Sequence, residues 1–374
     1  MDAARLIAGK VASIDASGIR RVFELGASLT DPVDLSIGQP DFDVPDPIKR
    51  AAIAAIEAGH NNYTVTQGLG ALRERISAEL AGEFNGWRPS VMVTGGVSGG
   101  LLLALMALLD PGDEVVYGDP YFVAYKALVQ LTSGKSALVD LYDERFQPDP
   151  DRFAAAITPK TKLILLNSPG NPTGVVHEPE RVKAIAELAR RRDVLIISDE
   201  IYNMLSYDGR SPSPADFAPE RTLLLRGFGK SYGMTGWRMG FAAGPAEIIT
   251  EMIKLQQYTF VCAPHMAQRG VLAAFDTDMS ATVRDYGRKR DLVTGELAGA
   301  FEFVRPSGGF YVFARAPKGY ASGTAFVERC IANKVLVIPG KVFSERDTHF
   351  RISYAARDDV LHRGCALLRR LAEG

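Results

Sequence analysis

Short apolar runs alternate with helical patterns between residues 90 and 241, and this alternation constrains the fold more than any other feature of the sequence. Six runs rich in aliphatic or β-branched residues predict strands, at residues 91–94, 114–118, 136–141, 162–166, 194–198 and 222–226. Near-continuous apolar strands are typical of a sheet covered on both faces. Helical patterns between them, such as residues 179–191, are long enough to connect parallel strands. We therefore expect an α/β fold with a mostly parallel, doubly wound sheet flanked by helices, and ligands at the carboxyl ends of its strands.

The pattern changes after about residue 275. A charged helical stretch at residues 279–300 precedes four strand candidates, at residues 301–305, 309–316, 335–338 and 349–354. The first 45 residues hold a weak helix and a segment rich in Gly and Pro that could cross between domains. We expect a large domain over residues 46–275 and a smaller α+β domain formed by residues 1–45 and 276–374.

The composition is that of an ordinary globular protein, with 47% hydrophobic and 23% charged residues. The 43 Lys and Arg residues against 44 Asp and Glu residues leave a net charge of −1, so the chain lacks the basic character usual in proteins that bind nucleic acid or anionic membranes.

The cysteines and apolar segments also restrict the class of protein. Cys262, Cys330 and Cys365 lie far apart, so we expect reduced core residues and neither disulfides nor a metal site. The longest apolar run, residues 101–109, is about half the length of a membrane-spanning helix. The first ten residues lack the apolar stretch of a signal peptide, so we expect a cytoplasmic protein.

Residues 96–100, Gly-Val-Ser-Gly-Gly, match the G-x-S-x-G pattern of a nucleophilic serine between a strand and a helix. An HGGG-type oxyanion segment is not found upstream, since Asn61 and Asn62 follow His60. The same small residues open a helix whose free N–H groups suit a phosphate. A nucleophile at Ser98, a phosphate cradle and a plain tight turn are the three interpretations.

Residues 229–231, Gly-Lys-Ser, resemble the end of a Walker A loop, but Leu224 stands where that pattern needs Gly. Lys230 then follows a strand, with glycines nearby that let a bulky group approach. The alternative interpretation of Lys230 is a solvated lysine in a loop. Asp199 ends another apolar strand and is costly to bury unless paired, although it could simply cap a turn.

These signals meet at one edge of one sheet, and together they resemble the class I and II aminotransferases, the fold-type I, aspartate-aminotransferase-like family that uses pyridoxal 5'-phosphate. The resemblance runs from about residue 36 to residue 355. It rests on SIGQPDF at 36–42, NSPGNPTG at 167–174, SDEIY at 198–202, GK with MTGWRMG at 229–240, and RISYA at 351–355.

The resemblance implies roles in catalysis and in holding the cofactor ring. Lys230 corresponds to the lysine that forms the Schiff base and moves the substrate proton. Asp199 corresponds to the acid that keeps the pyridine nitrogen protonated, while Asn171 and Tyr202 correspond to donors to its phenolic oxygen. Phe122 corresponds to the aromatic stacked on the ring, and a core phenylalanine is its alternative.

The resemblance also implies how phosphate and substrate are held. Arg238 corresponds to the arginine that grips the phosphate; Ser98 and the N–H groups of Val97 and Gly99 would complete the cradle. Arg351 corresponds to the arginine that binds the substrate α-carboxylate, with help from Gly38 and Asn171. Tyr63 corresponds to a tyrosine that reaches the neighbouring subunit's phosphate, which implies a homodimer with shared sites.

The expected function is amino transfer between an L-amino acid and a 2-oxo acid by a ping-pong mechanism. A lyase on the same scaffold is the first alternative, and a serine hydrolase using Ser98 a remoter one. The sequence departs from the family at Gly227, where a phosphate-binding serine is common. It does not name the amino acid, although the absence of a basic residue at Ser98 weighs mildly against an obligatorily acidic substrate.

Overall fold

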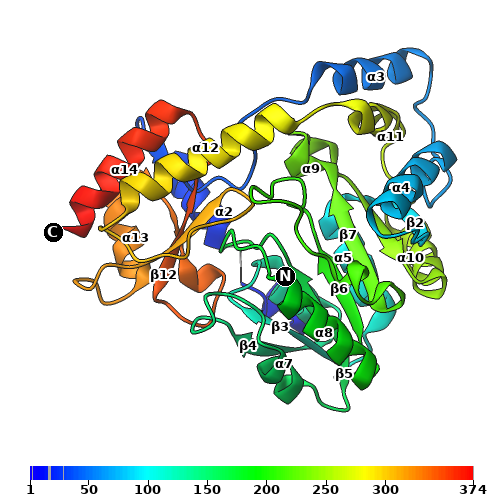
Figure 1. Ribbon diagram of the computed structural model, residues 1–374, viewed down its shortest axis with the longest axis horizontal. Helices are drawn as coiled ribbons and strands as arrows, with labels where there is room; N and C mark the ends of the chain where they lie inside the picture. The colour runs from blue at the N-terminus through cyan, green and yellow to red at the C-terminus, as the bar shows by residue number, and fades with distance from the viewer. Residues whose placement is uncertain (2, 16–17, 28, 374) are drawn as a thin grey trace.

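The computed structural model describes residues 1, 3–15, 18–27 and 29–373 and is built around a seven-stranded sheet (Figure 1). The strand order is β2-β8-β7-β6-β5-β3-β4. Strand β8 is antiparallel to both of its neighbours, and the other pairs are parallel. The bounds are β2 (Ser90–Gly95), β3 (Glu114–Asp119), β4 (Lys135–Asp140), β5 (Thr161–Asn167), β6 (Leu195–Asp199), β7 (Thr222–Gly227) and β8 (Met239–Gly244). The expected α/β fold with a mostly parallel, doubly wound sheet is confirmed.

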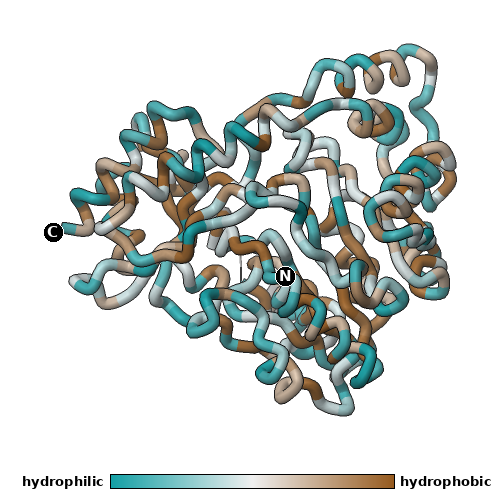
Figure 2. The backbone as a smooth tube through the Cα atoms, viewed as in Figure 1, coloured by the Kyte–Doolittle hydropathy of each residue, from teal (hydrophilic) through white to brown (hydrophobic). Residues whose placement is uncertain are grey.

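Side chains of the central strands alternate between two apolar layers. On β5, Leu163 and Leu165 belong to the cluster that contains α5 and α10 residues, whereas Ile164 and Leu166 belong to the cluster that contains α7 and α8 residues. Since successive side chains of a strand point to opposite faces, both faces of the sheet are covered. Figure 2 shows the resulting concentration of hydrophobic residues in the interior strands. The helices of these layers are α5 (Gly96–Leu108), α6 (Ala124–Leu131), α7 (Pro150–Ala156), α8 (Pro179–Arg192) and α10 (Ala246–Thr259).

A further apolar cluster lies at the β2 edge of the sheet. It includes residues of helices that precede the strands of the sheet in the sequence and of helices that follow them. Helices α3 and α11 contact each other there, and α11 also contacts α4. The bounds are α3 (Asp46–Glu57), α4 (Gly70–Glu83) and α11 (His265–Leu272). The very short helix α9 (Phe228–Ser231) follows β7 directly.

The C-terminal part forms a second sheet of order β11-β12-β9, with antiparallel pairs. Helix α12 runs from the helices near the large sheet to this smaller sheet, where it lies along α14 (Figure 1). The N-terminal segment joins the same region, because β1 pairs in parallel with β10 through Val33 and Val335. The bounds are α1 (Gly9–Ala12), α2 (Gly18–Ala27), β1 (Val33–Asp34), α12 (Ser280–Leu297), β9 (Tyr311–Arg315), α13 (Gly323–Ala332), β10 (Val335–Leu336), β11 (Ile338–Pro339), β12 (His349–Ser353) and α14 (Asp358–Ala372).

The structure differs from the strand predictions at several places, one of which is the short, unpredicted β1. Strand β8 was not expected, because its sequence Met-Gly-Phe-Ala-Ala-Gly lacks β-branched residues. Residues 301–305 form no strand and make only an isolated bridge between Phe303 and Ala314. The predicted strand at residues 335–338 is two short strands, β10 and β11, which pair in different sheets.

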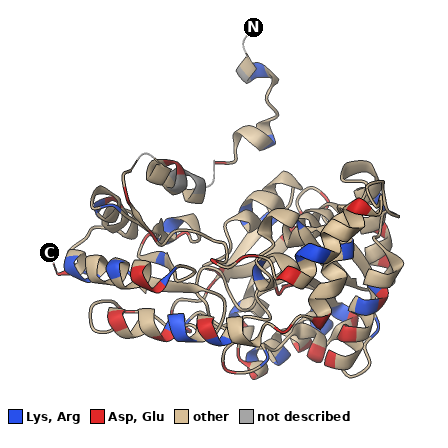
Figure 3. Ribbon diagram, turned by 90° about the horizontal axis from the view of Figure 1, so that it is seen from above, with Lys and Arg blue, Asp and Glu red and all other residues tan. Residues whose placement is uncertain are grey.

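Acidic and basic residues are intermixed along the helices (Figure 3). The three cysteines are free. None of the helices that the structure describes is long and apolar enough to cross a membrane.

Candidate active site

A cavity of about 620 Å³ lies at the carboxyl ends of β5 and β6, where it is closed by the start of α5, the 36–39 segment and residues of β9 and β12. This is the edge at which a doubly wound sheet binds ligands. Ten of the twelve residues expected at the site line it: Gly38, Val97, Ser98, Phe122, Asn171, Asp199, Tyr202, Lys230, Arg238 and Arg351. Gly99 and Tyr63 are not among the lining residues.

Lys230 lies in helix α9, one turn beyond β7, with its amine inside the cavity. Its Nζ donates to the carbonyl oxygen of Gly38, which ties the 36–39 segment to the sheet. Burial, followed by the positive charges of Arg351 and Arg238, lowers the pKa of Lys230 to about 8. The uncharged form that a nucleophile or proton carrier requires is therefore far more populated near neutral pH than it is for an ordinary lysine.

Asp199 ends strand β6 as a buried carboxylate that has no cationic partner among the described residues. Its Oδ2 accepts a hydrogen bond of 2.6 Å from Tyr125, and its Oδ1 accepts one of 3.3 Å from the Ile201 N–H. Burial, with a smaller contribution from the neighbouring Glu200, raises the pKa of Asp199 to about 6, although both of these hydrogen bonds oppose the shift. A buried acid of this kind, facing a cavity, can stabilise a cation that enters from outside.

Arg351 projects from β12 and is 1% exposed. Its guanidinium donates to Asn171 Oδ1 at 3.0 Å and to the Ser36 carbonyl at 2.8 Å, and it lies over the ring of Tyr311 at 4.3 Å. Its Nε has no hydrogen-bond partner in the structure. Burial lowers the pKa of Arg351, and no carboxylate pairs with it among the described residues. This planar donor is therefore suited to an incoming carboxylate.

The first turn of α5 forms an anion-binding corner with Arg238. Gly96 has a φ of +75°, and a Cβ there would lie 2.8 Å from Arg238 Nη2, so only glycine lets the guanidinium approach this closely. Ser98 is exposed to the cavity, while Gly99 is buried behind it in the same turn. Backbone N–H groups at the start of this 13-residue helix, a hydroxyl and an arginine together suit a phosphate.

Three residues at the site were not foreseen as such. Tyr125 donates to Asp199 from helix α6, and Tyr311 shares a hydrogen bond of 3.1 Å with the Tyr202 hydroxyl. Asn167 bridges the ends of β5 and β6, because it donates to the Asp199 carbonyl and accepts from the Asn171 N–H. Asn167 belongs to the NSPGNPTG motif, which gave a signal for it, whereas the tyrosines belong to no motif.

Tyr63 is 78% exposed and lies outside the cavity of its own chain. Its segment is held against neighbouring helices by Gln256, which donates to the Thr66 carbonyl at 2.6 Å, and by Gln268, which donates to Thr64 Oγ1 at 3.1 Å. The tyrosine is thus presented outward on a fixed backbone, and it cannot act in this chain's own cavity in this conformation.

The departure at Gly227 has a steric counterpart in the structure. A Cβ at this position would lie 2.9 Å from Ile201 Cδ1, 3.1 Å from Val97 Cγ2 and 3.2 Å from the Met239 carbonyl oxygen. Apolar side chains fill the place of a serine hydroxyl. A phosphate at this corner would therefore be held by the α5 turn and Arg238, without a hydroxyl from position 227.

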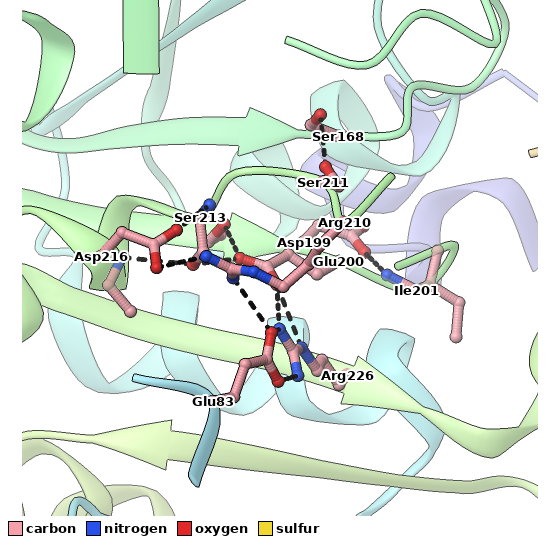
Figure 4. Close-up of polar contacts among 12 residues, drawn as sticks. Glu83, Ser168, Asp199, Glu200, Ile201, Arg210, Ser211, Ser213, Asp216 and Arg226 are labelled. Carbon is pink, nitrogen blue, oxygen red and sulfur yellow. Dashed lines mark hydrogen bonds and ion pairs between the residues drawn. The ribbon is translucent and has the colours of Figure 1, made fainter. Parts of the chain in front are cut away.

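A second group of polar residues surrounds Glu200, the residue that follows Asp199 (Figure 4). Glu200 accepts from Ser198 and Ser213 through Oε1 and from Arg226 through Oε2, at 2.5 to 3.0 Å. Arg226 also donates to both carboxylate oxygens of Glu83, at 2.6 and 2.8 Å. Burial alone would lower the pKa of Arg226, but Glu200 and Glu83 hold this pKa above its usual value. One buried guanidinium thus bridges two carboxylates, and Glu83 is also paired with Arg210 at 3.1 Å.

The serine-hydrolase interpretation of Ser98 finds no support in the geometry. Such a nucleophile needs a general base, most often histidine, within hydrogen-bond reach. None of the described residues that line the cavity is a histidine.

Comparisons with known proteins agree with the geometry. The family described as aminotransferase class I and II matches residues 30–366. A probable aspartate aminotransferase of Methanocaldococcus jannaschii is 38% identical, with 98% of this chain and 100% of that protein covered. An aspartate/prephenate aminotransferase of Thermus thermophilus is 36% identical, with 94% of each chain covered. The solved structure of Thermus thermophilus aspartate aminotransferase with maleate has a TM-score of 0.93 at 35% identity, covering 98% of this chain and 99% of that one.

Proposed function

Because the chain belongs to the class I and II aminotransferases, we propose that it uses pyridoxal 5'-phosphate to move an amino group between an L-amino acid and a 2-oxo acid. One observation carries this proposal. A lysine with a lowered pKa, a buried acid without a cation and a buried arginine without a carboxylate meet in one cavity of about 620 Å³. Each of these groups lacks the partner that cofactor or substrate would supply.

The described residues fit this cofactor. Arg238, Ser98 and the N–H groups of Val97 and Gly99 at the start of α5 would hold the phosphate. Asp199 would pair with the protonated ring nitrogen, since its carboxylate faces the cavity with no cation. When bound, pyridoxal phosphate supplies an electron sink for the bonds at the substrate Cα.

Residues around the ring position it. Phe122 lines the cavity beside the α5 turn and would cover one face of the ring. Tyr202 and Asn171 would donate to the phenolic oxygen, and Tyr311 fixes the Tyr202 hydroxyl at 3.1 Å. Tyr125 holds the Asp199 carboxylate in place through its hydrogen bond of 2.6 Å.

Lys230 would carry the cofactor and then move the proton between the substrate Cα and the cofactor. A pKa of about 8 suits both tasks, because the amine can lose and accept a proton near neutral pH. Arg351 would bind the substrate α-carboxylate, with Asn171 and the N–H of Gly38 nearby. Bonds to this carboxylate would replace the hydrogen bonds that Arg351 donates to Asn171 Oδ1 and to the Ser36 carbonyl.

We further assign a homodimer, in which Tyr63 reaches the phosphate bound by the partner subunit. The 78% exposure of Tyr63 and the nearby exposed Val65, Tyr258 and Phe260 support this assignment, since apolar surface of this kind commonly marks an interface. The proposal also includes a large cofactor-binding domain over residues 46–275, a smaller domain formed by residues 1–45 and 276–374, and a cytoplasmic location.

The test is a half-reaction screen of the protein loaded with pyridoxal phosphate. Each L-amino acid is added alone, and conversion of the cofactor to its amine form is followed by absorbance. At least one amino acid should convert the cofactor stoichiometrically and release the matching 2-oxo acid. Release of ammonia with a 2-oxo acid and without any acceptor would instead identify a lyase.

A further inference from the structure

A second cavity, of about 490 Å³, lies on the sheet face that α4 covers, between the last two turns of α4, helix α9 and the start of α12. Its described lining residues include none of those that line the cavity of about 620 Å³. They also include none of the exposed residues assigned to the dimer contact, Tyr63, Val65, Tyr258 and Phe260. The second cavity is therefore separate from the residues of the proposed active site and of the proposed dimer contact.

Aromatic rings form much of the wall of this second cavity. The centroid of the Phe228 ring lies 5.7 to 6.1 Å from the ring centroids of Tyr232, Phe241 and Phe275, and all four residues line the cavity. Aromatic rings offer apolar area, and their faces attract cations. The wall is therefore suited to a ligand with an apolar body.

Tyr232 brings a polar group without a partner to this wall. The residue is only 6% exposed, and its hydroxyl has no hydrogen-bond partner among the residues that the structure describes. Buried polar groups in proteins are normally hydrogen-bonded, and a buried one without a partner needs an explanation. Since Tyr232 lines the cavity, its hydroxyl is available to a polar atom of a ligand.

Acidic groups lie near this hydroxyl. Burial, followed by the negative charge of Glu79, raises the pKa of Tyr232 to about 12. Glu79 and Asp278 both line the cavity. Asp278 accepts hydrogen bonds from Ser280 at the start of α12 and makes no ion pair among the described residues. A cation in this cavity would therefore lie close to two carboxylates and a hydroxyl.

The arginines of this region already have partners. Arg226, the cation among the described lining residues, pairs with the two carboxylates of Glu83 and Glu200 (Figure 4). Arg75 lies outside the described lining and pairs with Glu79 and Asp276, each at 3.1 Å. The region thus has no unpaired arginine for an anionic ligand, whereas a cation can share Glu79 with Arg75.

We infer that this second cavity binds a small molecule with an apolar, preferably aromatic, body and one protonated amine. The body contacts the rings around Phe228, and the amine contacts the Tyr232 hydroxyl and the Glu79 carboxylate. The apolar body gains free energy by leaving water, and the ammonium donates to oxygen and is attracted by the ring faces. This inference goes beyond the proposed function and does not rest on it, because none of these residues is assigned to cofactor or substrate.

The experiment measures the binding of N,N-dimethyl-2-phenylethylamine to the holoenzyme by isothermal titration calorimetry at neutral pH. This tertiary amine is protonated there and cannot form a Schiff base, so its binding does not report on the cofactor aldehyde. We expect one site per chain, with an affinity about 10-fold or more above that for the neutral analogue 2-phenylethanol. The inference is overturned if the amine does not bind, or binds no more tightly than the alcohol.

Two variants test whether the amine occupies this cavity. Tyr232→Phe removes only the hydroxyl and Glu79→Gln only the charge, and each should weaken binding of the amine about 3- to 10-fold. The first change removes a group without a partner and the second lies at an exposed position, so both variants should fold. Glu74→Gln is the matched control, because Glu74 is exposed on the same helix outside the cavity, and it should leave the affinity unchanged. An affinity unchanged in both Tyr232→Phe and Glu79→Gln would place the amine elsewhere and overturn the inference.

Discussion

Two adjacent carboxylates at the end of β6 have opposite environments. Glu200 faces the network behind the sheet edge, where Arg226, Ser198 and Ser213 satisfy both of its oxygens. Asp199 faces the cavity with hydrogen bonds only from Tyr125 and the Ile201 N–H. Burial raises the pKa of both carboxyls, but only Glu200 has a cation that opposes the shift.

The difference separates charges that hold the fold from charges kept for a ligand. A buried ion pair that is fully hydrogen-bonded is sensitive to the loss of one member, because the other charge stays buried without compensation. An unpaired charge facing a cavity costs stability in the absence of its ligand and is retained for function. Substitutions on the two sides should therefore separate stability from activity.

The largest effect should come from breaking the network. Arg226→Met leaves Glu200 and Glu83 without their shared cation, and we expect a loss of about 3 to 5 kcal/mol in the free energy of unfolding, measured with urea. Adding Glu200→Gln and Glu83→Gln to Arg226→Met should recover part of this loss. A single variant as stable as the wild type would show that the network does not stabilise the fold.

Asp199→Asn should lower the activity without lowering the stability of the fold. We expect kcat/KM to fall about 100-fold or more, because a neutral amide cannot hold the ring nitrogen in its protonated form. The cofactor-free variant should be at least as stable as the wild type at pH 7. The reason is that a folded-state pKa of about 6, above the ordinary value of 3.8, makes the wild type lose stability as the pH rises between these values.

The matched control is Glu200→Gln, which removes the neighbouring charge. It should lower stability while changing kcat/KM less than about 10-fold, since Glu200 faces away from the cavity. Asp199→Glu should be milder than Asp199→Asn, because the charge survives. Near-normal turnover by Asp199→Asn would remove this residue as the partner of the ring nitrogen.

Arg351→Lys should lower kcat/KM by a similar factor for every amino acid, because all of them share the α-carboxylate. Reducing a bidentate pair to a single point contact costs about 1.5 to 3 kcal/mol, or about 10- to 150-fold. Steady-state rates with several amino acids measure this. A loss confined to acidic substrates would place Arg351 in the side-chain pocket instead.

The smallest effect concerns the pH dependence of stability through Lys230. Its folded-state pKa of about 8 lies below the ordinary value of 10.5, so the unfolded chain binds more protons between pH 8 and pH 10.5 and folding gains stability as the pH rises through this window. Relative to Lys230→Met, the cofactor-free wild type should gain about 1 to 2 kcal/mol between about pH 7.5 and pH 10. The same pH dependence of the free energy of unfolding in both proteins across this range would contradict the lowered pKa.

The sequence could predict the strands that local preference determines, but not a strand that tertiary contacts determine. Six strands of the large sheet were expected within about two residues of their bounds, because buried parallel strands are near-continuous apolar runs. Strand β8 was missed, since glycine and alanine fill positions where neighbouring backbone comes close; a Cβ at Gly240 would lie 2.7 Å from the Gly96 carbonyl carbon. Tertiary contact, not local preference, makes this segment a strand.

At the site, motifs predicted the residues that face a ligand better than the residues that support them. Lys230, Asp199 and Arg351 belong to motifs, whereas Tyr125 and Arg226 belong to elements whose sequences resemble any buried helix or strand. Their partners are far away in sequence, 74 residues for Tyr125 with Asp199 and 143 for Arg226 with Glu83. Such pairs follow from the topology of the sheet, and a single sequence does not encode them locally.

The most direct measurement of the central claim locates the cofactor. The protein is incubated with pyridoxal phosphate, reduced with borohydride to fix the cofactor to the amine that carries it, digested and mapped by mass spectrometry, with Lys230→Met as the control. The account predicts a yellow protein in which the label is on Lys230 and is absent from the variant. A label on another lysine, or a colourless protein that does not respond to the cofactor, would contradict it.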